Sequence, residues 1–335
     1  MRQLLYQRQP PGVGSSRGGG LGTQRHHPWN QRRSCGPGQG HDAPSARRGD
    51  TALSAHAAYL NVGIEFRTKD GHVPIFSANL GFLFTEDAFL DRLQTAAACG
   101  FRSVEFMSPY EIEPAELTAR LRQADVALDL FNLPVGDFAG GDRGLATSPA
   151  RRDAFRSGVE LAIAYAAELG TRKLNCLAGL REKSLSWDEQ YACLVENLAW
   201  ASARLASVGC LLLIEQLNPY ETPGFFIDSL DVAEKLLTDV GSANLRIQFD
   251  VYHVQRTHGD VVARLRRLMD RIGHVQIADS PDRHEPGTGE INYRFVLDEL
   301  DRLGYQGRVG LEYRPSRATA DTLGWVTEYG WNLNG

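Results

Sequence analysis

The chain has 335 residues, 42% of them hydrophobic and 23% charged, with a formal net charge of -5 and a pI of about 6.0. This balance is typical of a globular protein that forms one large barrel or two smaller domains, and its acidic charge gives no basic field for nucleic acid or an anionic membrane. The five cysteines form no C-x-x-C pair, and no apolar run approaches the roughly 20 residues of a membrane span, so we expect a cytoplasmic protein without a disulfide framework, a structural zinc, a membrane or a nucleic-acid partner.

The first part of the chain has the composition of a segment without a fold. From Met1 to about Asp50 it is rich in Gly, Pro, Arg, Ser and His and shows no apolar period. Such a stretch buries too little surface to offset the entropy of ordering it. We therefore expect a disordered or poorly ordered extension over residues 1–73 and a folded domain over residues 74–335.

After Pro74, short apolar runs of strand length alternate with longer segments of helical period. Glycines follow many of the helical runs, where a left-handed residue commonly ends a helix. The expected strands are 75–80, 103–106, 127–132, 173–177, 211–215, 245–250, 274–278 and 309–312, and the expected helices are 86–98, 114–124, 150–169, 187–207, 229–240, 260–270, 293–303 and 319–329.

Eight β-α units in about 260 residues predict a closed parallel (β/α)₈ barrel, the TIM barrel, in the α/β class. A doubly wound open sheet is the alternative. Such a sheet usually carries a Gly-rich phosphate turn after its first strand, and the turn at residues 79–82 has no G-x-G-x-x-G pattern.

Three of the expected strands end in an acid, namely Glu215, Asp250 and Glu312, and strand seven offers Gln276 or Asp279 near its end. Barrel enzymes place their active residues at the carboxyl ends of the strands. Converging buried carboxylates call for a cation, and hard oxygen ligands favour Mg²⁺ or Mn²⁺. The alternative is that each acid caps the following helix or pairs with an arginine.

His253 lies three residues after Asp250 and is expected at the same mouth, where it binds a substrate hydroxyl or the metal, or else serves the structure. The polar loop from Arg283 to Glu290 contains flexible residues and is a candidate lid or a solvated connection.

At these positions the sequence resembles the hydroxypyruvate isomerase family, which belongs to the xylose isomerase-like barrels. The resemblance runs from about Phe76 to Tyr329. The segments that carry it are FSANL at 76–80, GFRSVEF at 100–106, NLP at 132–134, IEQLN at 214–218, QFDVYH at 248–253, GHVQIAD at 273–279, EPGTGEIN at 285–292 and GLEY at 310–313.

The resemblance implies one divalent metal ion, Mg²⁺ or Mn²⁺, held by four side chains, and it selects Gln276 on strand seven. Glu215 and Glu312 would also move protons. The four expected metal ligands are Glu215, Asp250, Gln276 and Glu312.

The expected substrate-binding residues are Asn132, His253, Arg283 and Glu285. A substrate carboxylate calls for a cation, for which Arg283 and Arg143 are the candidates, and the alternative is that both are solvated surface charges. The sequence departs from many members of the family at two positions beside the expected pocket. These are Phe131, where some relatives have histidine, and Gln216, where many have proline.

The expected function is a metal-dependent aldose-ketose type isomerisation of a small hydroxy-oxo acid, hydroxypyruvate to 2-hydroxy-3-oxopropanoate (tartronate semialdehyde), through an ene-diolate. The alternatives are a 2-oxo-tetronate isomerase and a ketose 3-epimerase, then a non-catalytic sugar-acid-binding barrel and an endonuclease IV-like enzyme. The sequence leaves a homo-oligomer open.

Overall fold

The computed structural model describes residues 75–333. The extension expected over residues 1–73 lies outside this range. Within it, no helix combines the length and the apolar character that crossing a membrane requires.

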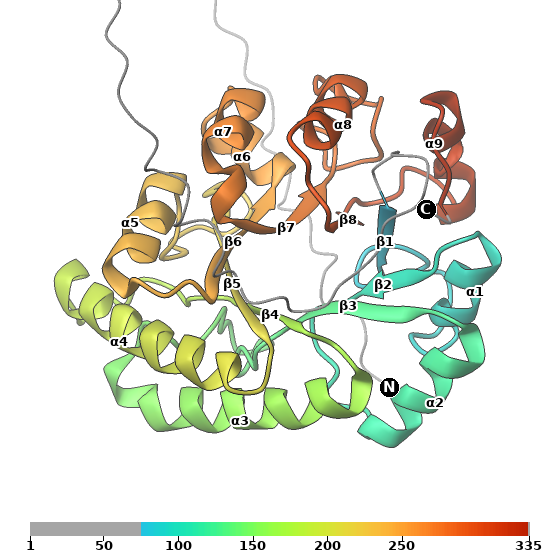
Figure 1. The fold of residues 1–335 in the computed structure, drawn as a ribbon. Helices are drawn as coiled ribbons and strands as arrows, with labels where there is room; N and C mark the ends of the chain where they lie inside the picture. The colour runs from blue at the N-terminus through green and yellow to red at the C-terminus, as the bar shows by residue number, and fades with distance from the viewer. Residues whose placement is uncertain (1–74, 334–335) are drawn as a thin grey trace, which may run out of the picture. The chain divides into compact units, whose positions relative to one another are not determined.

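Eight strands form a closed barrel in which each strand pairs in parallel with the next, and β8 pairs with β1 (Figure 1). The (β/α)₈ barrel predicted from the sequence is therefore confirmed. The strands are β1 (Ile75–Asn79), β2 (Ser103–Glu105), β3 (Ala127–Asn132), β4 (Lys173–Cys176), β5 (Leu211–Glu215), β6 (Leu245–Asp250), β7 (Ile272–Ile277) and β8 (Arg308–Leu311).

The helices surround this ring of strands (Figure 1). Their apolar faces pack onto the strands and bury residues such as Leu198 and Leu236 completely. The helices are α1 (Arg92–Ala98), α2 (Pro114–Ala124), α3 (Arg152–Leu169), α4 (Trp187–Ala206), α5 (Leu230–Val240), α6 (Val251–Thr257), α7 (Val261–Leu268), α8 (Tyr293–Arg302) and α9 (Gly324–Glu328), with 3₁₀ turns at Pro149–Arg151, Met269–Arg271 and Thr319–Thr322.

Most predicted boundaries agree with the structure to within a few residues, and the differences have local causes. Helix α1 begins at Arg92 and not near Glu86, because the Glu86 carboxylate accepts hydrogen bonds from Thr319 and is used to fasten the loop after β1. Helix α6 was not predicted. It follows β6 without a linker, since the Asp250 side chain accepts a hydrogen bond from the Tyr252 N–H and starts the helix directly. Gly170 and Gly241 end α3 and α5 in the left-handed conformation, as expected.

The interior of the barrel is polar, unlike the layer between strands and helices. Glu105 on β2 reaches Gln276 on β7, and Arg308 on β8 reaches Asp129 on β3. These strands are not neighbours in the ring, so the contacts pass through the barrel. Buried polar side chains must find partners, and here they find them across the barrel axis.

Substituting Leu198 by alanine should lower the free energy of unfolding by about 2–5 kcal/mol, because the side chain is fully buried on α4 and its loss leaves a cavity. Leu161→Ala on α3 is the matched control, since that leucine is 45% exposed and should cost less than about 1 kcal/mol. Urea unfolding of both variants measures the difference. Equal losses would contradict this account of the helix-strand layer.

Candidate active site

The four side chains expected to hold a metal converge at the carboxyl ends of neighbouring strands. Glu215 and Asp250 are the last residues of β5 and β6, Gln276 is paired with Asp250 in the register of β7, and Glu312 follows β8. All four are buried, with exposed fractions between 1% and 8%. The strand ends thus bring together residues that are far apart in the sequence, as expected of a barrel.

One amide group connects two of these side chains. The Gln248 Nε2 donates to Glu215 Oε2 at 2.9 Å and to Gln276 Oε1 at 2.6 Å. Asn175 Nδ2 donates to the same Glu215 oxygen at 3.1 Å. Glu215 Oε2 and Gln276 Oε1 therefore lie on either side of a single donor.

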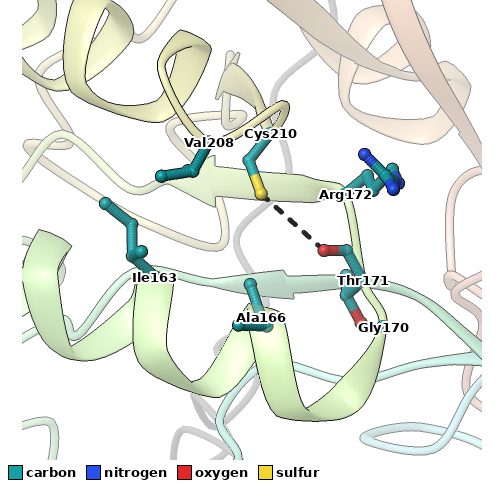
Figure 2. A pocket seen from close by; sticks show the side chains of 8 residues that line it. Ile163, Ala166, Gly170, Thr171, Arg172, Val208 and Cys210 are labelled. Carbon is teal, nitrogen blue, oxygen red and sulfur yellow. Dashed lines mark hydrogen bonds between the residues drawn. The ribbon is translucent and has the colours of Figure 1, made fainter. Parts of the chain in front are cut away.

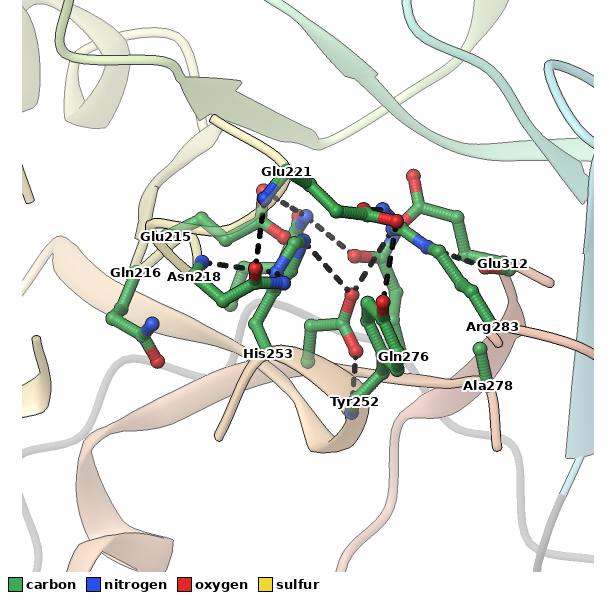
Figure 3. A network of polar contacts seen from close by, with 12 residues as sticks. Glu215, Gln216, Asn218, Glu221, Tyr252, His253, Gln276, Ala278, Arg283 and Glu312 are labelled. Carbon is green, nitrogen blue, oxygen red and sulfur yellow. Dashed lines mark hydrogen bonds and ion pairs between the residues drawn. The ribbon is translucent and has the colours of Figure 1, made fainter. Parts of the chain in front are cut away.

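Arg283 connects the other two. Its Nη2 lies 2.8 Å from Glu312 Oε2 and 3.3 Å from Asp250 Oδ2, and its Nη1 lies 2.6 Å from Glu221 Oε2 (Figure 3). The guanidinium lies over the rings of Phe82 and Tyr252, at 4.7 and 5.0 Å from their centroids. Arg283 is therefore held by charge on its edge and by aromatic rings on its faces.

The sequence alternative, in which each acid caps a helix or pairs with an arginine, is partly realised. Asp250 Oδ1 caps α6, and Arg283 pairs with both Asp250 and Glu312. These contacts do not balance the charge, however. Around the site four carboxyl groups meet two guanidinium groups, so that full ionisation would leave an excess of two negative charges. The carboxylates are those of Glu215, Glu221, Asp250 and Glu312, and the guanidinium groups are those of Arg283 and Arg314.

Burial and the crowding of negative charge raise the pKa values of three carboxyl groups in the site. Burial, with the charge of Asp250, raises the pKa of Glu215 to about 8 although Arg283 opposes the shift. Burial also raises the pKa of Asp250 and holds that of Glu312 well above its usual range. Carboxylates in this state gain from a bound cation.

The donor set fits a divalent metal ion. Glu215 and Asp250 offer carboxylate oxygens that lie, together with a ring nitrogen of His253, within 4.8 Å of one another. Gln276 adds an amide oxygen and Glu312 a further carboxylate close by. Carboxylate and amide oxygens are hard ligands, the type that Mg²⁺ and Mn²⁺ prefer.

A second cluster, Glu105, Asp129 and His274, lies deeper in the barrel and also has metal-like spacing. The charge balance of this cluster differs from that of the carboxyl-end site, because Asp129 pairs with Lys173 at 3.0 Å and with Arg308 at 3.2 Å. Burial alone would raise the pKa of Asp129, but Lys173, His274 and Arg308 lower it to about 2. Protein cations already neutralise this cluster, so it does not call for a metal. His274 was expected at the start of strand seven and instead lies inside it.

His253 is fixed as a hydrogen-bond donor toward the site. Its Nδ1 accepts from the Asn218 backbone N–H at 3.1 Å and faces Asn218 Nδ2 at 2.7 Å. Burial, together with Arg283 and Arg314, lowers the pKa of His253 well below its usual value, so the ring is neutral. A neutral ring that accepts at Nδ1 carries its proton on Nε2, which lies 3.5 Å from Asp250 Oδ2. This tautomer favours the substrate-hydroxyl role over the metal-ligand role.

Asp279, the alternative to Gln276, has a different task. Its two carboxylate oxygens accept from the backbone N–H groups of residues 280, 287, 289 and 291. The loop after β7 is therefore pinned to the end of its own strand. This contact argues for a fixed connection in place of the lid considered from the sequence.

The remaining sequence candidates lie around this group with separate partners. The Glu285 carboxylate accepts from the Ser316 N–H and hydroxyl, which braces two loops. Asn132 ends β3 and is buried, and its carbonyl accepts from the Tyr110 hydroxyl at 2.7 Å. Arg143 donates to backbone oxygens of its own loop and stacks on Phe138 at 4.0 Å.

The two departures from the family pattern also have clear environments. Phe131 is fully buried, and its ring centroid lies 6.0 Å from that of Tyr110. The Gln216 amide donates to the Thr257 hydroxyl of α6 at 2.9 Å, away from the carboxylates (Figure 3).

Hollows at the other end of the barrel do not gather comparable chemistry. One of about 190 Å³ lies where α3 ends and β4 and β5 begin (Figure 2). Its lining includes Ile163 and Val208, and the Cys210 thiol donates to the Thr171 carbonyl at 3.8 Å. The amino ends of barrel strands serve stability, so the carboxyl-end group remains the candidate site.

An eight-stranded parallel barrel with a buried carboxylate group at its carboxyl ends defines the class as a (β/α)₈ enzyme barrel. The family model described as xylose isomerase-like TIM barrel matches residues 93–329. The chain belongs to this family and, within it, to the group of hydroxypyruvate isomerase and its relatives, which are isomerases. The resemblance drawn from the sequence is confirmed.

Two curated relatives and two solved structures give the degree of similarity. Hydroxypyruvate isomerase from Escherichia coli (strain K12) is 46% identical over 254 residues, which cover 76% of this chain and 98% of the relative. 2-Oxo-tetronate isomerase from Cupriavidus necator is 44% identical over 257 residues, which cover 77% of this chain and 99% of the relative. A structure described as AP endonuclease, family 2, from Brucella melitensis has a TM-score of 0.75 at 38% identity and covers 77% of this chain and 99% of its own. D-Psicose 3-epimerase from Clostridium cellulolyticum H10 has a TM-score of 0.61 at 16% identity and covers 75% of this chain and 89% of its own, which shows a likeness of fold alone.

The raised pKa of Glu215 predicts a coupling between pH, metal and stability. Without metal, folded Glu215 holds its proton up to about pH 8, whereas the unfolded side chain loses it near pH 4.5. The folded state therefore binds more protons in this window, and its stability should fall as the pH rises from 6.5 to 8. Mn²⁺ must displace that proton, so Mn²⁺ should raise the melting temperature more at pH 8 than at pH 6.5.

Thermal melts with and without Mn²⁺ at the two pH values measure this coupling. The Glu215→Gln variant is the control and should show a smaller loss of stability with pH and a smaller gain from Mn²⁺. A gain from Mn²⁺ that is the same at both pH values would count against a protonated Glu215 in the site.

Proposed function

We propose that this protein is a divalent-metal-dependent isomerase that interconverts hydroxypyruvate and 2-hydroxy-3-oxopropanoate through an ene-diolate. The observation that carries the proposal is the buried group of Glu215, Asp250 and Glu312, with Gln276, whose negative charge exceeds that of its arginine partners. The identity to relatives that are named hydroxypyruvate isomerase and 2-oxo-tetronate isomerase supports the choice of substrate.

Glu215, Asp250, Gln276 and Glu312 would hold Mg²⁺ or Mn²⁺. When bound, the ion supplies Lewis-acid polarisation of the substrate carbonyl, which makes the neighbouring C–H more acidic. One glutamate, Glu215 or Glu312, takes the proton from C3 of hydroxypyruvate and leaves an ene-diolate. The same or the opposite glutamate then delivers a proton to C2, while the hydroxyl proton on O3 passes to O2.

Arg283 and His253 would bind the rest of the substrate. The Arg283 guanidinium is buried and pairs with Glu221, Asp250 and Glu312. It would turn its Nη2 to the substrate carboxylate when a metal ion takes over Asp250 and Glu312. The Nε2–H of His253 would donate to a substrate oxygen. Asn132 lies at the end of β3, at the same end of the barrel, and stays a candidate for a further contact. Glu285 is better suited to holding the Arg283 loop through Ser316.

A 2-oxo-tetronate isomerase is the first alternative, because the same four ligands and two glutamates would serve a substrate that is longer by one carbon. A ketose 3-epimerase would also use them but would invert a centre without moving the carbonyl. An endonuclease is less favoured, since a multi-metal site needs additional histidine and carboxylate ligands and His253 already directs an N–H into the site. We also propose action in the cytoplasm with a small-molecule substrate.

Product analysis by NMR tests the reaction. The Mn²⁺-loaded protein should convert hydroxypyruvate in D₂O to 2-hydroxy-3-oxopropanoate. Deuterium at C2 indicates that the delivered proton comes from solvent, and protium at C2 indicates that one glutamate returns the proton taken from C3. Preferred turnover of a 2-oxo-tetronate would support the longer substrate. If neither acid is isomerised and a ketose is epimerised, the proposal is wrong.

Glu312→Gln should lower kcat by about 10²- to 10⁴-fold, because the amide cannot accept or deliver the proton. The variant should still melt cooperatively, since the amide can keep the contact with Asn79, but at a lower temperature because it loses the ion pair with Arg283. Glu299→Gln on α8 removes a carboxylate outside the barrel and should leave kcat unchanged. Retained isomerisation by Glu312→Gln would contradict the two-glutamate scheme.

Arg283→Gln should raise KM for hydroxypyruvate by roughly 10- to 100-fold, the effect of losing a charge-assisted hydrogen bond of about 1.5–3 kcal/mol. Dihydroxyacetone has the same hydroxymethyl ketone without the carboxylate, so its inhibition constant as a competitor of hydroxypyruvate should change less. If both compounds lose the same factor in affinity, Arg283 acts by holding the metal ligands Asp250 and Glu312 and does not bind the substrate carboxylate.

A further inference from the structure

The Gln276 side chain has two unlike ends, and only one of them can bind a metal. The amide oxygen is a ligand, whereas the NH₂ group is a donor and repels a cation. The three carboxylates of the site do not have this ambiguity, because their two oxygens are equivalent. Its orientation depends on its neighbours at both ends: Gln248 Nε2 donates to the Gln276 oxygen at 2.6 Å on the site side, and a second group accepts from the NH₂ group at the far end.

Glu105 is the group in contact with the far end of that amide. Its Oε1 accepts from Gln276 Nε2 at 2.6 Å, and its Oε2 lies 2.8 Å from His274 Nε2. Glu105 ends β2 and is fully buried, although β2 and β7 are separated by β8 and β1 in the ring. The carboxylate therefore crosses the barrel interior to reach Gln276.

The direction of the Glu105 contact is fixed independently by Asn79. The Asn79 Oδ1 accepts from the Gly81 backbone N–H at 3.0 Å, so the other end of that amide must be Nδ2. This Nδ2 donates to Glu105 Oε1 at 3.1 Å and to Glu312 Oε1 at 3.2 Å. Glu105 Oε1 is thus an acceptor, and Gln276 must present Nε2 to it and Oε1 to the other side.

Gly310 on β8 leaves the room for this crossing. A Cβ at position 310 would lie 2.4 Å from Glu105 Oε1 and 2.6 Å from Oε2. The path of Glu105 from β2 to β7 thus depends on the absence of a side chain on the strand between them. The contact between Glu105 and Gln276 therefore requires both the long side chain at position 105 and the glycine at position 310.

We propose that Glu105 is a positioning residue of this site, which holds the Gln276 amide with its oxygen toward the metal and its NH₂ group away from it. The inference rests on the proposed metal site. Glu105 itself does not need to touch the metal or the substrate.

Two substitutions of similar size test the proposal, with Mn²⁺ affinity measured by the EPR signal of free Mn²⁺. Glu105→Met removes the acceptor for the Gln276 NH₂ group, so Gln248 alone holds the amide and the affinity should fall roughly 10- to 100-fold. In Gln276→Glu alone, two carboxylate oxygens would meet at the present 2.6 Å contact, so that variant should also bind more weakly than the double variant.

The double variant, Glu105→Met with Gln276→Glu, needs no orienting acceptor at position 105 and brings no second carboxylate to the contact. Either oxygen of the new carboxylate can face the metal, so the Mn²⁺ affinity should return at least to that of the unchanged protein. The two effects should therefore be strongly non-additive. Glu299→Gln, which removes a buried carboxylate from α8, is the matched control and should leave the affinity unchanged.

The outcomes separate the proposals. If the unchanged protein binds no Mn²⁺, the metal site itself is wrong and this inference falls with it. If it binds Mn²⁺ and Glu105→Met binds equally well, only the role of Glu105 is wrong. Additive losses in the double variant would also overturn it, because the loss of a merely structural carboxylate at position 105 is not rescued by a change of the ligand at position 276. Should Glu105→Met fail to show a melting transition, a folded double variant that binds Mn²⁺ supports the proposal, and a folded one that does not bind overturns it.

Discussion

A surplus of buried negative charge at one end of the barrel is the constraint on which the rest of the site depends. Burying a carboxylate is costly unless a cation compensates it. The interior cluster around Asp129 solves this with Lys173 and Arg308, and the pKa of Asp129 falls. At the mouth the carboxylates outnumber their arginines, and the pKa of Glu215 rises. Two acidic groups in one barrel thus have opposite electrostatic states, and only the outer one is suited to receive a metal.

The elements around the mouth hold this charge in place by giving side chains more than one partner. Asp250 starts α6 with one oxygen and turns the other to the site. The Asp279 carboxylate accepts hydrogen bonds from backbone N–H groups of the following loop, and the Arg283 backbone N–H donates to the Asp279 carbonyl. Arg283 therefore comes from a loop that is fixed at both its backbone and its guanidinium. The site is rigid because its helix start, its loop and its ion pairs share the same residues.

The sequence was sufficient for the barrel because strand and helix periods are local properties. Strand-end acids indicated the mouth, and the family resemblance proposed Gln276 as the fourth ligand. The polar interior was not predicted. Alternate polar residues such as Lys173 and Asn175 on β4, or His274 and Gln276 on β7, carry a period of two that signals one shared face. That signal does not say which strands meet across the axis, because contacts such as Glu105 to Gln276 depend on barrel closure. The balance of charge around Asp129 could likewise not be read from one strand.

Gly310 has a consequence for how sequences with this architecture can vary. Its missing side chain is useful only while a long carboxylate passes from position 105, and the carboxylate fits only while position 310 is glycine. A change at either position alone leaves a clash or a void, whereas a shorter residue at 105 removes the reason for glycine at 310. Positions 105 and 310, on strands that do not pair with each other, should therefore vary together among related chains. Such covariation would reveal the path of Glu105 across the barrel from sequences alone.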